Sequence, residues 1–112
     1  MEIKTTFGPV TVLSVTGDID AATFPQLVSA VNEVLDKGNV KLVLDLGQVN
    51  YISSGGLVAL QTISGRAGDL NGKVALCSVR DRVAKVLNIS GFDKFLAVFP
   101  DVAAARASLE EK

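Results

Sequence analysis

The stretch from Val40 to Leu46 constrains the fold of this chain more than any other. It is an almost unbroken run of valine and leucine, interrupted only by Lys41 and Asp45. A short run of this kind is typical of a central strand in a parallel sheet, because helices cover such a strand. The run therefore predicts an α/β fold built around it.

Two β patterns precede this run. Residues 2–7 alternate apolar and polar side chains with period two, and residues 10–16 are rich in β-branched side chains. Alternation and β-branching both favour strands, and Gly8-Pro9 between the two segments favours a turn. The two segments are therefore predicted to pair as an antiparallel hairpin.

Helix and strand patterns alternate along the rest of the chain. Thr23 and Gln26 fit a capping box, in which each side chain bonds a backbone N–H near the other, at the start of a helix that reaches about Lys37. The later elements are predicted to be a helix over residues 54–70, a strand over 73–77, a helix around Val83, a strand over 95–99 and a helix from Pro100. The helix over 54–70 is expected to face the core with Gly56, Leu60, Ile63, Ala67 and Leu70. The predicted fold is a single α/β domain over residues 1–112, with one mixed, largely parallel β-sheet, an N-terminal β-hairpin and about four α-helices.

The composition excludes several classes of function. The chain has 112 residues and a formal net charge of −1, so it lacks the basic field that attracts nucleic acid. It contains no histidine, which removes the usual general base and the commonest metal ligand. Cys77, the single cysteine, ends an apolar run as a small core residue would. We therefore predict no metal, no cofactor and no enzymatic activity, and, with no membrane span or signal peptide visible, a cytoplasmic protein.

Polar side chains follow two strands that are predicted to be neighbours. Asp18 and Asp20 come after the second strand, and Ser53 and Ser54 come after the central one. Loops that leave the carboxyl ends of parallel strands share one edge of the sheet, where ligands usually bind. We therefore expect these four residues to lie on a common rim.

The two serines and the two glycines after them allow more than one interpretation. Ser53 or Ser54 is expected to be the N-cap of the following helix, and a cap alone explains one serine. A phosphate on Ser54 would meet free backbone N–H groups at the positive end of the helix, so Ser54 is also a candidate for regulatory phosphorylation. Gly55 and Gly56 are explained either by close packing of the backbone against a neighbouring strand or by the close approach of a partner protein.

Asp18 and Asp20 could form a carboxylate pair for acid–base chemistry or for Mg²⁺. No histidine, no nearby lysine and no third acidic ligand accompany them in the sequence, so the sequence gives a metal or catalytic site little support. Helix capping or contacts to a partner are therefore the favoured interpretations.

Three of these segments together resemble the STAS domain family of anti-sigma factor antagonists. They are Gly17–Thr23, Leu42–Leu46 and Tyr51–Leu57. The resemblance implies a protein that, unmodified, binds an anti-sigma factor that is also a serine kinase and thereby frees the sigma factor. The kinase then phosphorylates a serine at the start of the second helix, which releases the partner, and a PP2C-type phosphatase resets the protein.

The resemblance also assigns roles to single residues. Family members carry Asp-Ser-Ser/Thr-Gly-Leu at the acceptor, and matching Gly56-Leu57 to the last pair makes Ser54 the phosphoacceptor. Ser53 then stands where the family has aspartate, and Gly55 where it has a small hydroxyl residue. Asp20 matches an acidic residue in the loop that frames the acceptor. The expected partner-binding residues are Asp18, Asp20, Ser53, Gly55 and Gly56.

Two other functions remain open from the sequence. The chain could be a STAS-like docking subunit of a lipid-transport or stress-signalling complex, in which the same rim binds a partner without phosphorylation. It could also be a small enzyme or ligand-binding domain that uses Asp18 and Asp20, although the absence of histidine disfavours this function.

Overall fold

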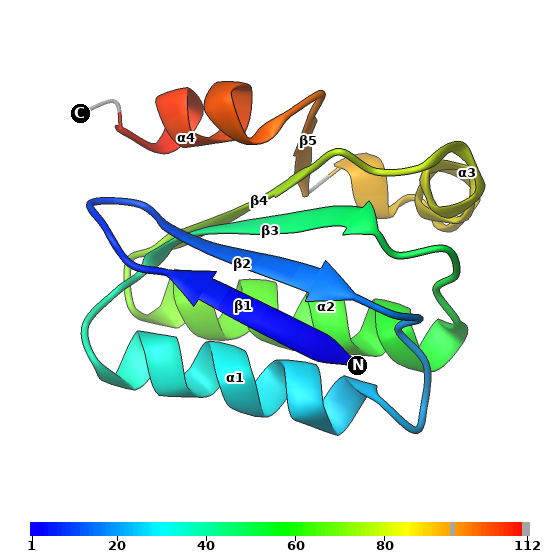
Figure 1. Ribbon diagram of the computed structural model, residues 1–112, viewed down its shortest axis with the longest axis horizontal. Helices are drawn as coiled ribbons and strands as arrows, with labels where there is room; N and C mark the ends of the chain where they lie inside the picture. The colour runs from blue at the N-terminus through cyan, green and yellow to red at the C-terminus, as the bar shows by residue number, and fades with distance from the viewer. Residues whose placement is uncertain (95, 111–112) are drawn as a thin grey trace.

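The computed structural model describes residues 1–94 and 96–110. Within them a five-stranded sheet has its strands in the order in which they occur along the chain (Figure 1). The strands are β1 (Glu2–Thr6), β2 (Thr11–Thr16), β3 (Lys41–Gln48), β4 (Lys73–Cys77) and β5 (Ala97–Phe99). β1 pairs antiparallel with β2, and every other pair is parallel. The predicted hairpin and the largely parallel sheet are confirmed.

Helices cover both faces of the sheet, as the apolar run of β3 requires. They are α1 (Phe24–Asp36), α2 (Ser54–Asp69), α3 (Asp81–Ser90) and α4 (Val102–Glu110), with a short 3₁₀ turn η1 (Phe92–Lys94) after α3. Figure 1 shows α1 and α2 side by side on one face of the sheet and α4 on the other. The four predicted helices are confirmed, and of the strand predicted over 95–99, Phe95 lies outside the described residues.

The core has two parts, one on each face of β3. Leu42, Leu44 and Leu46 pack in the larger part, with the buried side chains of α1 and α2. Val43 points the other way and packs with Ala105 and Leu109 of α4. All four β3 side chains are fully buried, so the central strand contributes to both layers, as its sequence predicts.

Two local predictions about the helices are wrong. The Thr23 side chain does not cap α1; its hydroxyl instead donates to the backbone oxygen of Asp18 at 2.8 Å. The Gln26 amide donates to the backbone oxygen of Met1 at 3.0 Å rather than reaching back to Thr23. Leu70 is exposed, because α2 ends at Asp69 and Leu70 is its C-cap.

Among residues 1–94 and 96–110, every helix is too short or too polar to cross a lipid bilayer.

Candidate functional site

The structure brings the loop after β2 and the loop after β3 together. Beyond the regular strands, Ile19 and Ile52 form an isolated parallel bridge, and both side chains are buried. The Ile19 N–H donates to the Tyr51 oxygen at 3.0 Å, and the Ser53 N–H donates to the Ile19 oxygen at 2.9 Å. The two loops therefore continue the β2–β3 pairing up to the first residue of α2, and they form the common rim that strand order predicts.

The two serines at the start of α2 have different environments. Ser53 is the N-cap, with an extended backbone, and its hydroxyl accepts a hydrogen bond from the Gly56 N–H at 3.2 Å. Ser54 is the first residue of the helix and is exposed. Within the described part of the chain its hydroxyl has no hydrogen-bond partner. Ser53 thus stabilises the start of α2 as its N-cap, whereas Ser54 presents a free hydroxyl to solvent.

Close packing accounts for Gly56. A methyl group on Gly56 would overlap the backbone oxygen of Ile19 and would lie 2.6 Å from Cγ1 of Ile52. Gly55 is less constrained, since its methyl group would lie 3.2 Å from the backbone of Ala21. The loop after β2 therefore rests directly on the first turn of α2, and Gly56 permits that contact.

Asp20 organises its own loop. Its Oδ1 atom accepts from the backbone N–H groups of Ala22 and Thr23 at 3.0 and 3.1 Å, and the Thr23 hydroxyl lies 3.1 Å away. The Asp18 side chain is exposed on the same rim. Among the described residues, no group of three or more acidic, cysteine or histidine side chains is placed to hold a metal ion. The carboxylates of Asp18 and Asp20 therefore differ in role, and Asp20 is held by hydrogen bonds to its own loop.

Two exposed apolar side chains near Ser54 were not anticipated as site residues. Tyr51, in the loop before α2, is 47% exposed, and Val58, one helical turn after Ser54, is 52% exposed. The signal in the sequence was the position of Val58, because spacing of four residues puts it on the same helix face as the polar Ser54.

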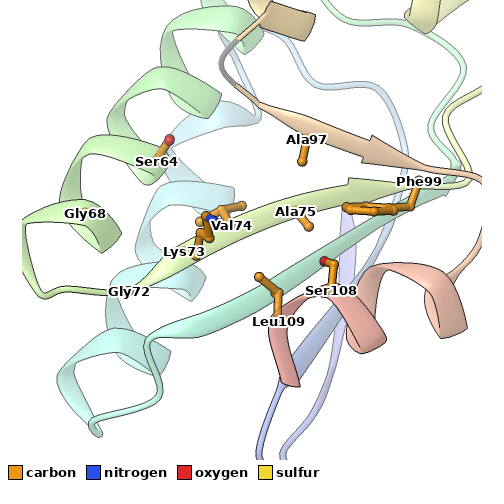
Figure 2. Close-up of a pocket in the computed structure, with 10 residues that line it drawn as sticks. All are labelled: Ser64, Gly68, Gly72, Lys73, Val74, Ala75, Ala97, Phe99, Ser108 and Leu109. Atoms are coloured by element: carbon orange, nitrogen blue, oxygen red, sulfur yellow. The ribbon is translucent and has the colours of Figure 1, made fainter. Parts of the chain in front are cut away.

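Neither Cys77 nor the groove at the far end of α2 belongs to this rim. Cys77 is fully buried, and burial raises the pKa of its thiol, so the side chain is a neutral core residue at physiological pH. A groove of about 290 Å³ lies beside β4, β5, α2 and α4. Figure 2 shows the residues that line it. Its walls include Ser64 and Gly68, which lie toward the end of α2 opposite Ser54.

Comparison with known proteins agrees with this architecture. Residues 2–105 match the sequence model of the STAS domain. The anti-sigma-F factor antagonist RsfB of Mycobacterium tuberculosis is 36% identical over 92 residues, which cover 80% of this chain and 73% of RsfB.

Two solved structures show the same fold. The crystal structure of TM1081 from Thermotoga maritima has a TM-score of 0.91 at 22% identity, and covers 97% of this chain and 95% of that one. The Bacillus cell fate determinant SpoIIAA in its phosphorylated form has a TM-score of 0.72 at 13% identity, and covers 96% of this chain and 99% of that one.

Proposed function

Because the chain belongs to the STAS domain family, we propose that it is an anti-sigma factor antagonist switched by phosphorylation of Ser54. The unmodified protein binds an anti-sigma factor that is also a serine kinase and frees the sigma factor. Phosphorylation of Ser54 by that kinase releases the complex, and a PP2C-type phosphatase restores the binding form. RsfB, a relative at 36% identity, carries the name of an anti-sigma factor antagonist.

The observation that carries this proposal is the free hydroxyl of Ser54. It is exposed at the first position of α2, and the neighbouring Ser53 performs the capping role that would otherwise occupy it. A kinase can therefore modify Ser54 without removing a hydrogen bond that the fold needs. The positive end of the α2 dipole and the unpaired N–H groups of the first turn would stabilise the phosphate.

Electrostatics gives the expected size of the switch. A phosphoserine carries about −1.5 to −2 charges at neutral pH. A like charge about 4 Å away in the partner would cost about 4 kcal/mol at an effective dielectric constant near 20. Since each 1.4 kcal/mol is about tenfold in affinity, one such contact would weaken binding on the order of several hundredfold.

The alternative role of Asp18 and Asp20 as a catalytic pair finds less support. The Asp20 carboxylate already accepts hydrogen bonds from Ala22 and Thr23. A substrate or metal ion would have to compete with these bonds. The proposal therefore gives Asp18 and Asp20 the role of framing the acceptor and contacting the partner, together with Ser53, Gly55 and Gly56.

The test begins with the native complex. The tagged chain is purified from its own cells, its partner is identified by mass spectrometry, and its phosphopeptides are mapped. The partner is then produced recombinantly and titrated with the wild-type chain, Ser54→Ala and Ser54→Asp. We expect a kinase-type anti-sigma factor, phosphate on Ser54, tight binding by Ser54→Ala, and binding by Ser54→Asp that is weaker by about tenfold or more.

Equal affinities of Ser54→Ala and Ser54→Asp would refute the phosphorylation switch. A chain that is unmodified in every growth condition and bound to a different assembly would instead favour the docking-subunit function.

A further inference from the structure

Helix α2 ends in a Schellman motif, a helix end that two backbone hydrogen bonds close around a residue with left-handed backbone. The Asn71 N–H donates to the Gly68 oxygen at 3.0 Å, and the Gly72 N–H donates to the Ala67 oxygen at 2.7 Å. The left-handed residue is Asn71, with a φ of 62°. Figure 2 shows Gly68 on α2 and Gly72 in the turn that leads to β4. An asparagine followed directly by glycine therefore closes this helix.

Helix α1 ends in the same motif, with the two residue types in the opposite order. The Gly38 N–H donates to the Leu35 oxygen at 2.9 Å, and the Asn39 N–H donates to the Val34 oxygen at 3.3 Å. Here Gly38 is the left-handed residue, with a φ of 91°, and Val40 follows Asn39. The end of α1 thus provides an internal comparison for the chemistry of the asparagine at the end of α2.

The fold favours this particular pair at the end of α2. A methyl group on Gly72 would overlap the backbone oxygen of Val40, so close packing requires glycine there. The Lys73 N–H donates to the same oxygen at 2.8 Å, which holds the turn against the residue before β3. Position 71 needs left-handed backbone, which asparagine adopts more readily than most residues with a side chain. Asn71 is also exposed to solvent.

An asparagine before glycine is a reactive setting for deamidation, because glycine places no side chain beside the attacking nitrogen. The Gly72 backbone nitrogen gives its proton to a solvent base and attacks Cγ of Asn71. The bond from Cγ to the side-chain nitrogen breaks, ammonia leaves, and a cyclic imide joins the two residues. Water then opens the imide to aspartate or isoaspartate, so water has replaced ammonia with no change in oxidation state. The other asparagines precede residues with side chains: Glu33, Val40, Tyr51 and Ile89.

The Schellman motif also restrains this reaction in the folded chain. The Gly72 nitrogen must lose the proton that it donates to the Ala67 oxygen, so it can attack only after that hydrogen bond breaks. Local parts of a fold open at a lower free energy than the whole fold. The folded chain is therefore expected to react through a conformation in which the end of α2 is open, and to react more slowly than the unfolded chain.

We propose that Asn71 is a site of spontaneous deamidation, and that opening of the Schellman motif at the end of α2 controls its rate. Three observations carry the proposal: the order of Asn71 and Gly72, the exposure of Asn71, and the hydrogen bond that engages the Gly72 nitrogen. The site is separate from the proposed phosphoacceptor, because Ser54 begins α2 and Asn71 follows its end.

Deamidation changes both the charge and the length of this turn. The new carboxylate lies at the C-terminal end of α2, two positions after Asp69, where negative charge is unfavourable. Isoaspartate also adds a carbon to the backbone between residues 71 and 72, which displaces Gly72 from its place against Val40. The deamidated chain is therefore less stable than the original chain.

Incubation of the full chain in mildly alkaline buffer tests the proposal. Trypsin cuts after Arg66 and Lys73, so Asn71 is the single amide side chain of peptide 67–73, and mass spectrometry detects the replacement of ammonia by water. Folded protein is compared with protein unfolded in guanidinium chloride. We expect Asn71 to react ahead of the other asparagines in both, and about tenfold or more slowly in the folded chain. Equal rates would refute control by the motif, and earlier reaction of another asparagine, such as Asn39, would refute the site.

Two variants test the site and its control separately. Asn71→Gly, which adopts left-handed backbone but has no amide to lose, should keep the mass of peptide 67–73 constant. Gly68→Ala strengthens the last turn of α2 at a position where a methyl group would meet no atom within 4 Å. It should slow the reaction of the folded chain about fivefold and leave the unfolded chain unchanged. A folded rate that Gly68→Ala leaves unchanged would show that this helix end does not control the reaction.

The stability of the aged protein gives an independent readout. Aged wild-type protein should show a lower midpoint of urea unfolding than fresh protein, whereas Asn71→Gly should show the same midpoint before and after ageing. An equal fall in both would place the destabilising reaction elsewhere in the chain and contradict the proposal. None of these measurements uses the anti-sigma factor, so their outcome is separate from the test of the proposed function.

Discussion

The two adjacent serines at the start of α2 have different roles. Ser53 accepts the Gly56 N–H and so stabilises the helix, whereas Ser54 has a free hydroxyl. We expect Ser53→Ala to lower the free energy of unfolding by about 1 kcal/mol, the usual cost of losing an N-cap. Ser54→Ala should be close to neutral. Urea unfolding of both variants measures the two free energies of unfolding. An equal decrease in both would contradict the assignment of the capping role to Ser53 alone.

Thr11 on β2 has an unsatisfied polar group. The residue is fully buried, and its hydroxyl has no hydrogen-bond partner among the described residues. Valine has nearly the same shape and lacks the hydroxyl, so Thr11→Val should raise the free energy of unfolding by about 1 kcal/mol. Denaturant unfolding measures this change, and a loss of stability would show that the hydroxyl is bonded, for instance by a buried water.

At the scale of single elements, the glycines of α2 have opposite consequences for stability. A methyl group at Gly56 would collide with the Ile19 oxygen, whereas one at Gly65 would meet no neighbour. We expect Gly56→Ala to cost about 1–3 kcal/mol through overpacking. Gly65→Ala should instead stabilise the helix by about 1 kcal/mol. The midpoint of urea unfolding should therefore fall for Gly56→Ala and rise for Gly65→Ala. A shift of both midpoints in the same direction would show that the two glycines do not differ in packing as described.

The elements themselves follow from patterns that are local in the sequence. The valine and leucine run of β3 and the apolar spacing of α1 and α2 depend on burial alone, so they could be predicted. The capping box could not be predicted, because several oxygen atoms can accept from the Thr23 hydroxyl, which donates to the backbone oxygen of Asp18 at 2.8 Å. Gln26 bonds Met1, which is 25 residues away in the sequence, and no local pattern reports such a contact.

The candidate site was only partly predictable for the same reason. Strand order was enough to bring Asp18, Asp20, Ser53 and Ser54 to one rim. The choice of Ser53 as the cap depended on a single hydrogen bond of 3.2 Å, which two adjacent serines leave open. The exposure of Val58 depended on which face of α2 packs against the sheet, and that required the assembled fold.

At the scale of the whole molecule, the proposed switch should leave the fold unchanged. The rim is held by the Ile19–Ile52 bridge and by the Ser53–Ile19 hydrogen bond, and neither uses the Ser54 side chain. In ¹H–¹⁵N NMR spectra of Ser54→Asp we therefore expect amide shifts to change only around residues 51–58 and in the loop after β2. Widespread changes across the sheet would indicate that the switch works by altering the fold.

The backbone bridge between Ile19 and Ile52 also determines what kind of signal this protein can transmit. Because this bridge does not involve the Ser54 side chain, and because the proposed switch uses a single modified residue, the chain itself gives the switch no cooperativity. With tight binding, the amount of anti-sigma factor bound to this protein would then follow the fraction of the protein that is unmodified. If the proposed kinase and phosphatase act on Ser54, any threshold in the cellular response would come from their balance and from the ratio of partners rather than from this protein.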